Sequence, residues 1–204
     1  FRYGKEYKMT VQFTDQYIFK NEAYHITALE NPLVFDPSDY GAFPVSFCPA
    51  CARGFYGQYG LREGRLCLRN LYMTTLGHYP EIRGVAPEAN SQDFFLSLFK
   101  VYRGVNIPAA YSGGMFIGRD LVEDFYESTG VQKHYAYKDV YLLKFKDGRL
   151  KSARDYSDKM QKIRDDIICD TNYFYYDETS FSFVRNPSYD SPYEVNWEDL
   201  IKQE

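Results

Sequence analysis

The sequence predicts an α+β fold, in which hairpins form a mainly antiparallel, strongly twisted sheet that about three helices accompany. Two acidic-glycine pairs, Glu63-Gly64 and Asp147-Gly148, each separate two strand-like runs, as in tight β-hairpins. Aromatic residues make up 19% of the chain, which suits the half-buried faces of a sheet. Three other segments space their apolar residues as an amphipathic helix does.

The first third of the chain is expected to form hairpins around a loop. Residues 10–29 hold β-branched and aromatic residues on both sides of the turn-prone Asn21-Glu22. Four prolines punctuate residues 31–49, which is typical of a loop. Residues 54–73 give the clearest hairpin, because apolar and polar residues alternate after the Glu63-Gly64 turn.

Helices are predicted near residues 91–103, 120–129 and 157–168, where apolar residues recur every three or four positions. Residues 109–118 are expected to form a strand that Gly113-Gly114 interrupts. We expect residues 1–204 to form a single domain. Residues 170–204, which contain strand-like pieces, would be an extension packed on the body of that domain.

An internal echo links the two predicted hairpins. The hexapeptides LREGRL (residues 61–66) and FKDGRL (residues 145–150) lie 84 positions apart. Two explanations stay open: both are hairpins of a favoured turn type, or a β-unit has been duplicated.

Charge and hydropathy narrow the classes of partner. The net charge is −4 and no basic stripe occurs, which argues against a nucleic-acid backbone as partner. No apolar run approaches the ~18 residues that a membrane-spanning helix needs. We therefore expect no nucleic-acid partner, no membrane and a cytoplasmic location, although the chain begins with Phe1 and a removed signal peptide stays an open alternative.

The segment SFCPACARGFYG places Cys48 and Cys51 around a Pro-Ala pair. A redox pair would need a helix after the first cysteine, but two glycines follow here. A zinc site needs four ligands, and Cys67 with a histidine would have to complete it. The pattern favours reduced structural thiols and no cofactor, with a metal site at Cys48, Cys51 and Cys67 as the alternative.

An enzyme is the second functional class to consider. The common catalytic motifs G-x-S-x-G and H-E-x-x-H are absent from the sequence. A catalytic or metal site would have to assemble from scattered residues around the cysteine pair, such as Arg53, Arg103 and His134. We expect no catalytic residue, and this alternative stays open.

Three stretches of sequence carry a resemblance: CARGFYGQYGLREGRLCLRNL, YSGGMFIGRDLVEDFYESTGVQ and YKDVYLLKFKDGRLKSARDYSDKM. Together they resemble a group of uncharacterised small bacterial proteins with an R-G-Y/F strand, a Y-x-G-G strand and two G-x-L hairpins. The resemblance covers roughly residues 17–164. Its motifs are turn and core signals, so it implies a shared fold and transfers no catalytic residue.

The favoured functional hypothesis is a non-enzymatic bacterial binding protein that neutralises a basic protein partner, as an immunity protein does. Tyrosine offers large contact area and carboxylates steer a basic partner. The predicted binding residues are Tyr173, Tyr175, Tyr176, Asp177, Glu178 and Tyr189. The alternative is that these tyrosines cover an edge of the sheet.

Overall fold

The computed structural model describes residues 12–90, 96–127, 130–177, 179, 182–186, 193, 195–197 and 200. The strands are β1 (Gln16–Phe19), β2 (Glu22–Leu29), β3 (Phe55–Arg62), β4 (Arg65–Met73), β5 (Glu88–Ala89), β6 (Lys100–Pro108), β7 (Gly113–Leu121), β8 (Tyr137–Lys146), β9 (Arg149–Asp155), β10 (Phe174–Asp177) and β11 (Ser182–Arg185). The helices are α1 (Ser157–Cys169) and the 3₁₀ turns η1 (Pro37–Tyr40), η2 (Leu96–Leu98), η3 (Glu123–Phe125) and η4 (His134–Ala136).

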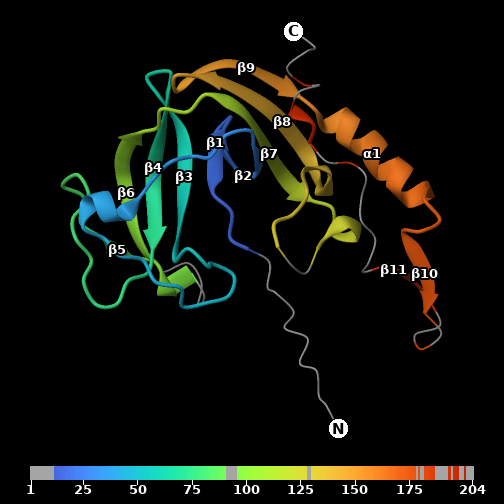
Figure 1. The fold of residues 1–204 in the computed structure, drawn as a ribbon, viewed down its shortest axis with the longest axis horizontal. Helices are drawn as coiled ribbons and strands as arrows, with labels where there is room; N and C mark the ends of the chain where they lie inside the picture. The colour runs from blue at the N-terminus through green and yellow to red at the C-terminus, as the bar shows by residue number, and fades with distance from the viewer. Residues whose placement is uncertain are drawn as a thin grey trace.

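The main sheet runs in the order β3-β1-β2-β7-β8-β9-β4-β6-β5, and β3 also pairs with β4 (Figure 1). The strands from β3 to β4 therefore close into a ring, and β6 and β5 extend it from the edge of β4. Neighbouring strands are antiparallel except β1 and β3, which pair in parallel through Gln16–Gln58 and Tyr17–Tyr59. The predicted α+β fold with a mainly antiparallel sheet is confirmed.

The predicted hairpins are confirmed, and their turns share one backbone conformation. Both central residues have positive φ in the turns Glu63-Gly64 and Asp147-Gly148. Such turns match the right-handed twist of the strands they join. The first hairpin turns at Lys20-Asn21, which also have positive φ, one residue earlier than the predicted Asn21-Glu22.

The two echoing hairpins meet and close the ring. Arg65, the first residue of β4, pairs with Arg149, the first residue of β9. The Leu66 amide donates a hydrogen bond of 2.7 Å to the Gly148 carbonyl. The Gly148 amide in turn donates to the Tyr111 carbonyl at 2.8 Å. We call this narrow contact between β4 and β9 the seam.

Strands β7 and β8 separate two apolar cores. Met115 and Ile117 face the core inside the ring, whereas Phe116 between them faces the core beneath α1. The same alternation continues in β8, where Leu143 faces the ring and Leu142 faces α1. The period of two in the sequence therefore places apolar residues on both faces, as in a buried strand. Figure 1 shows α1 lying along this outer face.

Two of the three predicted helices are wrong. In the region predicted as a helix over 91–103, residues 91–95 lie outside the described residues, and β6 begins at Lys100. Val101 and Tyr102 are both fully buried, so these neighbours cover opposite faces of a strand that pairs with β4. The segment predicted as a helix over 120–129 starts as the end of β7, where Leu121 pairs with Tyr137. In its described part, up to residue 127, it continues as the short 3₁₀ turn η3.

The third predicted helix is confirmed as α1. The Asp155 carboxylate accepts a hydrogen bond of 2.9 Å from the Ser157 amide at its start. Its buried stripe is Met160, Arg164 and Ile167, at the spacing of one helix face. The strand-like pieces after residue 170 form the separate hairpin β10–β11. Helix α1 is the one α-helix whose bounds lie within the described residues, and none of the described helices is long and apolar enough to cross a membrane.

Candidate functional site

The Cys48–Cys51 segment forms a tight turn that buries the Cys51 thiol. The Cys51 amide donates to the Cys48 carbonyl at 3.1 Å, and the Gly54 amide donates to the Cys51 carbonyl at 3.0 Å. Both cysteines are free thiols, and Cys51 is buried against Tyr56 and Phe99. Burial, reinforced by the neighbouring Cys48, raises the pKa of the Cys51 thiol to about 11. Cys51 is therefore a protonated thiol at neutral pH and a poor nucleophile.

Cys67 lies in β4, away from that turn, and its thiol faces the Gly60 carbonyl at 3.5 Å. Burial raises the pKa of the Cys67 thiol as well. Within the described ranges, no group of three or more His, Cys, Asp and Glu side chains could hold a metal ion. The alternative metal site at Cys48, Cys51 and Cys67 is thus not assembled among these residues.

The scattered residues of the enzyme alternative lie in three different environments. Arg53 forms an ion pair of 3.0 Å with Asp15, and Arg103 pairs with Glu88 at 3.3 Å. His134 is buried beneath α1, where its ring stacks on Phe116. The structure therefore does not bring these three side chains together.

The buried His134 predicts a pH-dependent stability. Burial, together with Lys133 and Lys159, lowers the pKa of His134 to about 4, whereas the unfolded value is 6.5. The unfolded chain thus binds the proton first, and stability falls as the pH drops through 6.5 toward 4. We expect the free energy of unfolding to decrease by about 2–3 kcal/mol from this group between pH 7 and pH 4.5.

Urea unfolding at the two pH values measures this effect. His134→Phe, which keeps a planar ring against Phe116, should remove that share of the pH dependence. If the free energy of unfolding of the variant still differs between pH 7 and pH 4.5 as much as that of the wild type, the effect does not come from His134.

The predicted C-terminal binding residues do not form one exposed face. Tyr173 is 1% exposed, stacks on Phe125 and donates its hydroxyl to the Asp124 carbonyl at 2.9 Å. It is a core residue, so its prediction as a binding residue is wrong. Tyr175, Tyr176 and Asp177 lie in β10, and the Asp177 carboxylate accepts a hydrogen bond from the Thr179 amide. Glu178 and Tyr189 lie outside the described residues.

The most exposed large apolar side chains lie in two loop segments, residues 34–47 and the residues after β4. Val34, Phe43, Phe47 and Leu76 are 57–85% exposed, more than any other large apolar side chain in the described part. An antiparallel bridge between Pro44 and Thr75 holds the two segments together, so Phe43 and Leu76 flank it. We call Val34, Asp36, Asp39, Phe43, Phe47 and Leu76 the loop surface.

Both segments of the loop surface are rigidly attached to the ring. The Val45 amide donates to the Thr74 carbonyl at 2.9 Å, directly after β4. The Ala42 amide donates to the Pro37 carbonyl, which fixes η1 against the next residues. The exposed side chains are therefore displayed by an ordered backbone, which reduces the entropy lost when a partner binds.

The charge around the loop surface has a single sign. From Asn21 to Ala52 the charged side chains are carboxylates, and the same is true from Asn70 to Ile82, where Glu81 is the charged residue. Hydrogen bonds from Ser38 lower the pKa of the Asp36 carboxyl, which keeps it ionised. Of the cations that flank these ranges, Arg53 is paired with Asp15, and Arg83 donates to the Asn106 carbonyl. Acidic and apolar groups thus share this surface.

Sequence reasoning missed the loop surface because it interpreted residues 31–49 only as a connection. The available signal was a proline-rich stretch that combines large apolar residues with carboxylates and holds no lysine or arginine. Comparison with known proteins finds no family model, no curated protein and no solved structure that matches this chain.

Proposed function

We propose that this protein is a non-enzymatic binding protein that docks a basic protein partner on the loop surface. The observation that carries the proposal is that exposed apolar side chains lie in two bridged segments whose own charged side chains are carboxylates. Apolar side chains such as Phe43 and Leu76 supply contact area, and carboxylates favour a partner with lysine and arginine. An immunity-like role toward a basic bacterial protein is consistent with this chemistry.

The required partner presents apolar side chains ringed by lysine or arginine. Asp39 offers a charge at the first turn of η1, and Phe43 follows that turn. The carboxylates steer the encounter and the apolar groups hold the complex, so affinity should fall with salt but not vanish.

A random peptide library bound to the purified protein tests the proposal. We expect enriched peptides that combine lysine or arginine with aromatic or branched aliphatic residues. The double variant Leu76→Ala with Asp39→Asn should weaken binding of these peptides by about tenfold or more. Asp36 is left intact because it accepts a hydrogen bond from the Ser38 amide.

A matched control uses one exposed leucine and one exposed acid elsewhere. Leu121→Ala with Glu123→Gln removes the same two chemical groups at the end of β7 and in η3. Selected peptides should bind this variant as they bind the wild type. Selection of acidic peptides, or equal weakening by both double variants, would refute docking at the loop surface.

A further inference from the structure

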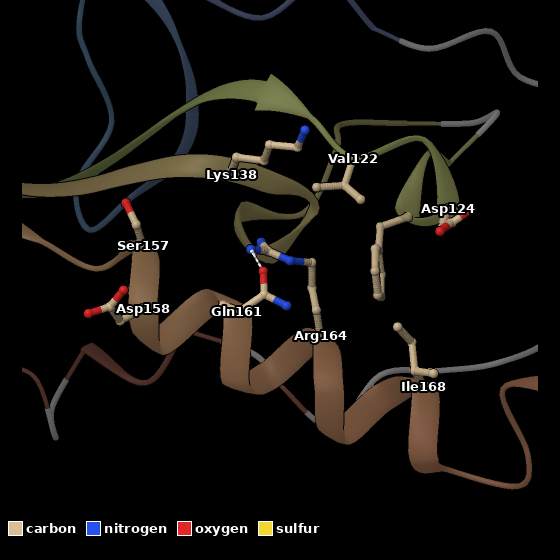
Figure 2. Close-up of a pocket in the computed structure, with 9 residues that line it drawn as sticks. Val122, Asp124, Lys138, Ser157, Asp158, Gln161, Arg164 and Ile168 are labelled. Carbon is tan, nitrogen blue, oxygen red and sulfur yellow. Dashed lines mark hydrogen bonds between the residues drawn. The ribbon is translucent and has the colours of Figure 1, made fainter.

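A pocket of about 480 Å³ lies between α1 and the segment that joins β7 to β8 (Figure 2). Its polar lining includes Arg164 and Gln161 of α1 and Lys138 of β8. Its apolar lining consists of Val122, Phe125 and Ile168. A cavity of this size, with an apolar wall and few polar groups, matches sites for small organic molecules.

Arg164 is an unusual residue for a protein interior, because its guanidinium is buried without a carboxylate partner. The residue is 3% exposed, and no carboxylate of the described residues lies within ion-pair distance. Burial lowers the pKa of Arg164, and Asp165 opposes this. A buried cation is normally paired, so its environment favours an anion nearby.

The hydrogen bonds of Arg164 leave one side of the guanidinium open. Its Nη1 donates to the carbonyls of Tyr135 and Tyr137 at 2.8 and 2.6 Å, and Nη2 donates to Gln161 Oε1 at 2.8 Å. Among the described residues, Nε and the second Nη2 hydrogen have no partner. Nε and Nη2 are the two nitrogens of the planar fork that arginine offers to a carboxylate.

The other charged groups of the lining favour an anion at this fork. Figure 2 shows the Lys138 ammonium above the guanidinium, whereas the carboxylates of Asp124 and Asp158 point away from it at the rim. Asp165 accepts a hydrogen bond of 2.8 Å from Gln161 Nε2, and its charge also acts on Arg164. The centre of the pocket is therefore the place where positive charge is least compensated.

We propose that this pocket binds a small organic acid, with its carboxylate on Arg164 and Lys138 and its apolar body against Val122, Phe125 and Ile168. The apolar wall favours an amphiphilic acid over inorganic phosphate, which has no apolar part. The proposal goes beyond docking at the loop surface and does not depend on it, because α1 and η1 lie on different sides of the molecule (Figure 1).

Hexanoate and its neutral analogue hexanamide probe the pocket, and amide chemical shifts of the protein report binding. Hexanoate should bind about tenfold more tightly than hexanamide, because only the acid pairs with the fork. The shifts should concentrate at residues 122–125 and 157–168. Inorganic phosphate should bind more weakly than hexanoate.

Two lysine variants provide the matched comparison. Lys138→Gln should weaken hexanoate binding several-fold, whereas Lys133→Gln, an exposed lysine outside the lining, should leave it unchanged. Arg164→Lys keeps the charge and loses the planar fork, so it should abolish the preference for hexanoate over hexanamide. If that variant does not fold, two comparisons still test the proposal: Lys138→Gln against Lys133→Gln, and hexanoate against hexanamide.

Three results would overturn the proposal. Hexanamide could bind as tightly as hexanoate, or phosphate could do so, or both lysine variants could lose the same affinity. Equal binding of hexanamide would exclude the contact of the carboxylate with Arg164. Equal binding of phosphate would exclude a contribution from the apolar body of the ligand. Equal losses in both lysine variants would exclude a site localised at this pocket.

Discussion

Replacing Gly148 with alanine is expected to lower the free energy of unfolding by about 3 kcal/mol or more. Gly148 has a φ of 72°, a conformation that is strained by about 1–2 kcal/mol for a residue with a side chain. An added Cβ would also lie 2.6 Å from the Ala109 carbonyl oxygen. Overlap with a backbone atom adds about 1–3 kcal/mol, because the main chain must move.

Gly64 provides the matched control for this prediction. It has a φ of 74° and occupies the same position in the other echoing hairpin, but nothing lies within 4 Å of an added Cβ. Gly64→Ala should therefore cost only about 1–2 kcal/mol, the strain of the backbone conformation. Urea denaturation of the two variants measures the difference. Equal losses would show that the Ala109 segment moves aside freely.

Tyr173→Ala is the second large effect that we expect, with a loss of about 3–5 kcal/mol in the free energy of unfolding. The ring of Tyr173 fills the core beneath α1 and stacks on Phe125 at 5.8 Å between centroids. Tyr173→Phe should cost only about 1 kcal/mol, since it keeps the ring and removes the hydroxyl that donates to the Asp124 carbonyl.

Thermal or urea unfolding separates this core role from a role in binding. Phe47→Ala serves as the control, because Phe47 is 57% exposed and should change stability by less than about 0.5 kcal/mol. A fully stable Tyr173→Ala variant would contradict the core assignment. The same experiment bears on truncation, since a chain cut before Tyr173 would lose this packing.

The predicted parts of the fold are those that local chemistry decides. The turns at Glu63-Gly64 and Asp147-Gly148 were predictable because their residues tolerate positive φ. Helix α1 was predictable because the apolar residues Met160, Ile163 and Ile167 recur at helical spacing. Both signals lie within a few residues and need no knowledge of distant partners.

The missed parts depend on contacts between distant residues. The spacing of Phe94, Phe95, Leu98, Val101 and Tyr102 in the sequence is typical of a helix, but pairing with β4 places Val101 and Tyr102 in a strand and buries both. The closure of the ring needs Arg65 beside Arg149, which no local pattern encodes. Non-local pairing outweighs local propensity in such segments.

The candidate sites divide in the same way into features that local sequence predicts and features that depend on contacts between distant residues. Structural thiols at Cys48 and Cys51 were the favoured interpretation, because two glycines and no helical pattern follow the pair. Tyr173 was assigned to the surface because tyrosine suits both an interface and a core, and sequence cannot distinguish the two. The pocket at Arg164 depends on the carbonyls of Tyr135 and Tyr137, which only the folded chain brings to the helix.

The seam has a consequence for the order in which the chain folds. Each echoing hairpin closes around its own two-residue turn, an event of about microseconds, whereas the seam joins segments from opposite halves of the chain. Closing such a long loop loses more chain entropy and slows folding. Arg65 and Arg149 also bring like charges face to face, which opposes the last approach. We infer that the hairpins form early and that the ring closes late, with dissolved salt easing the final step.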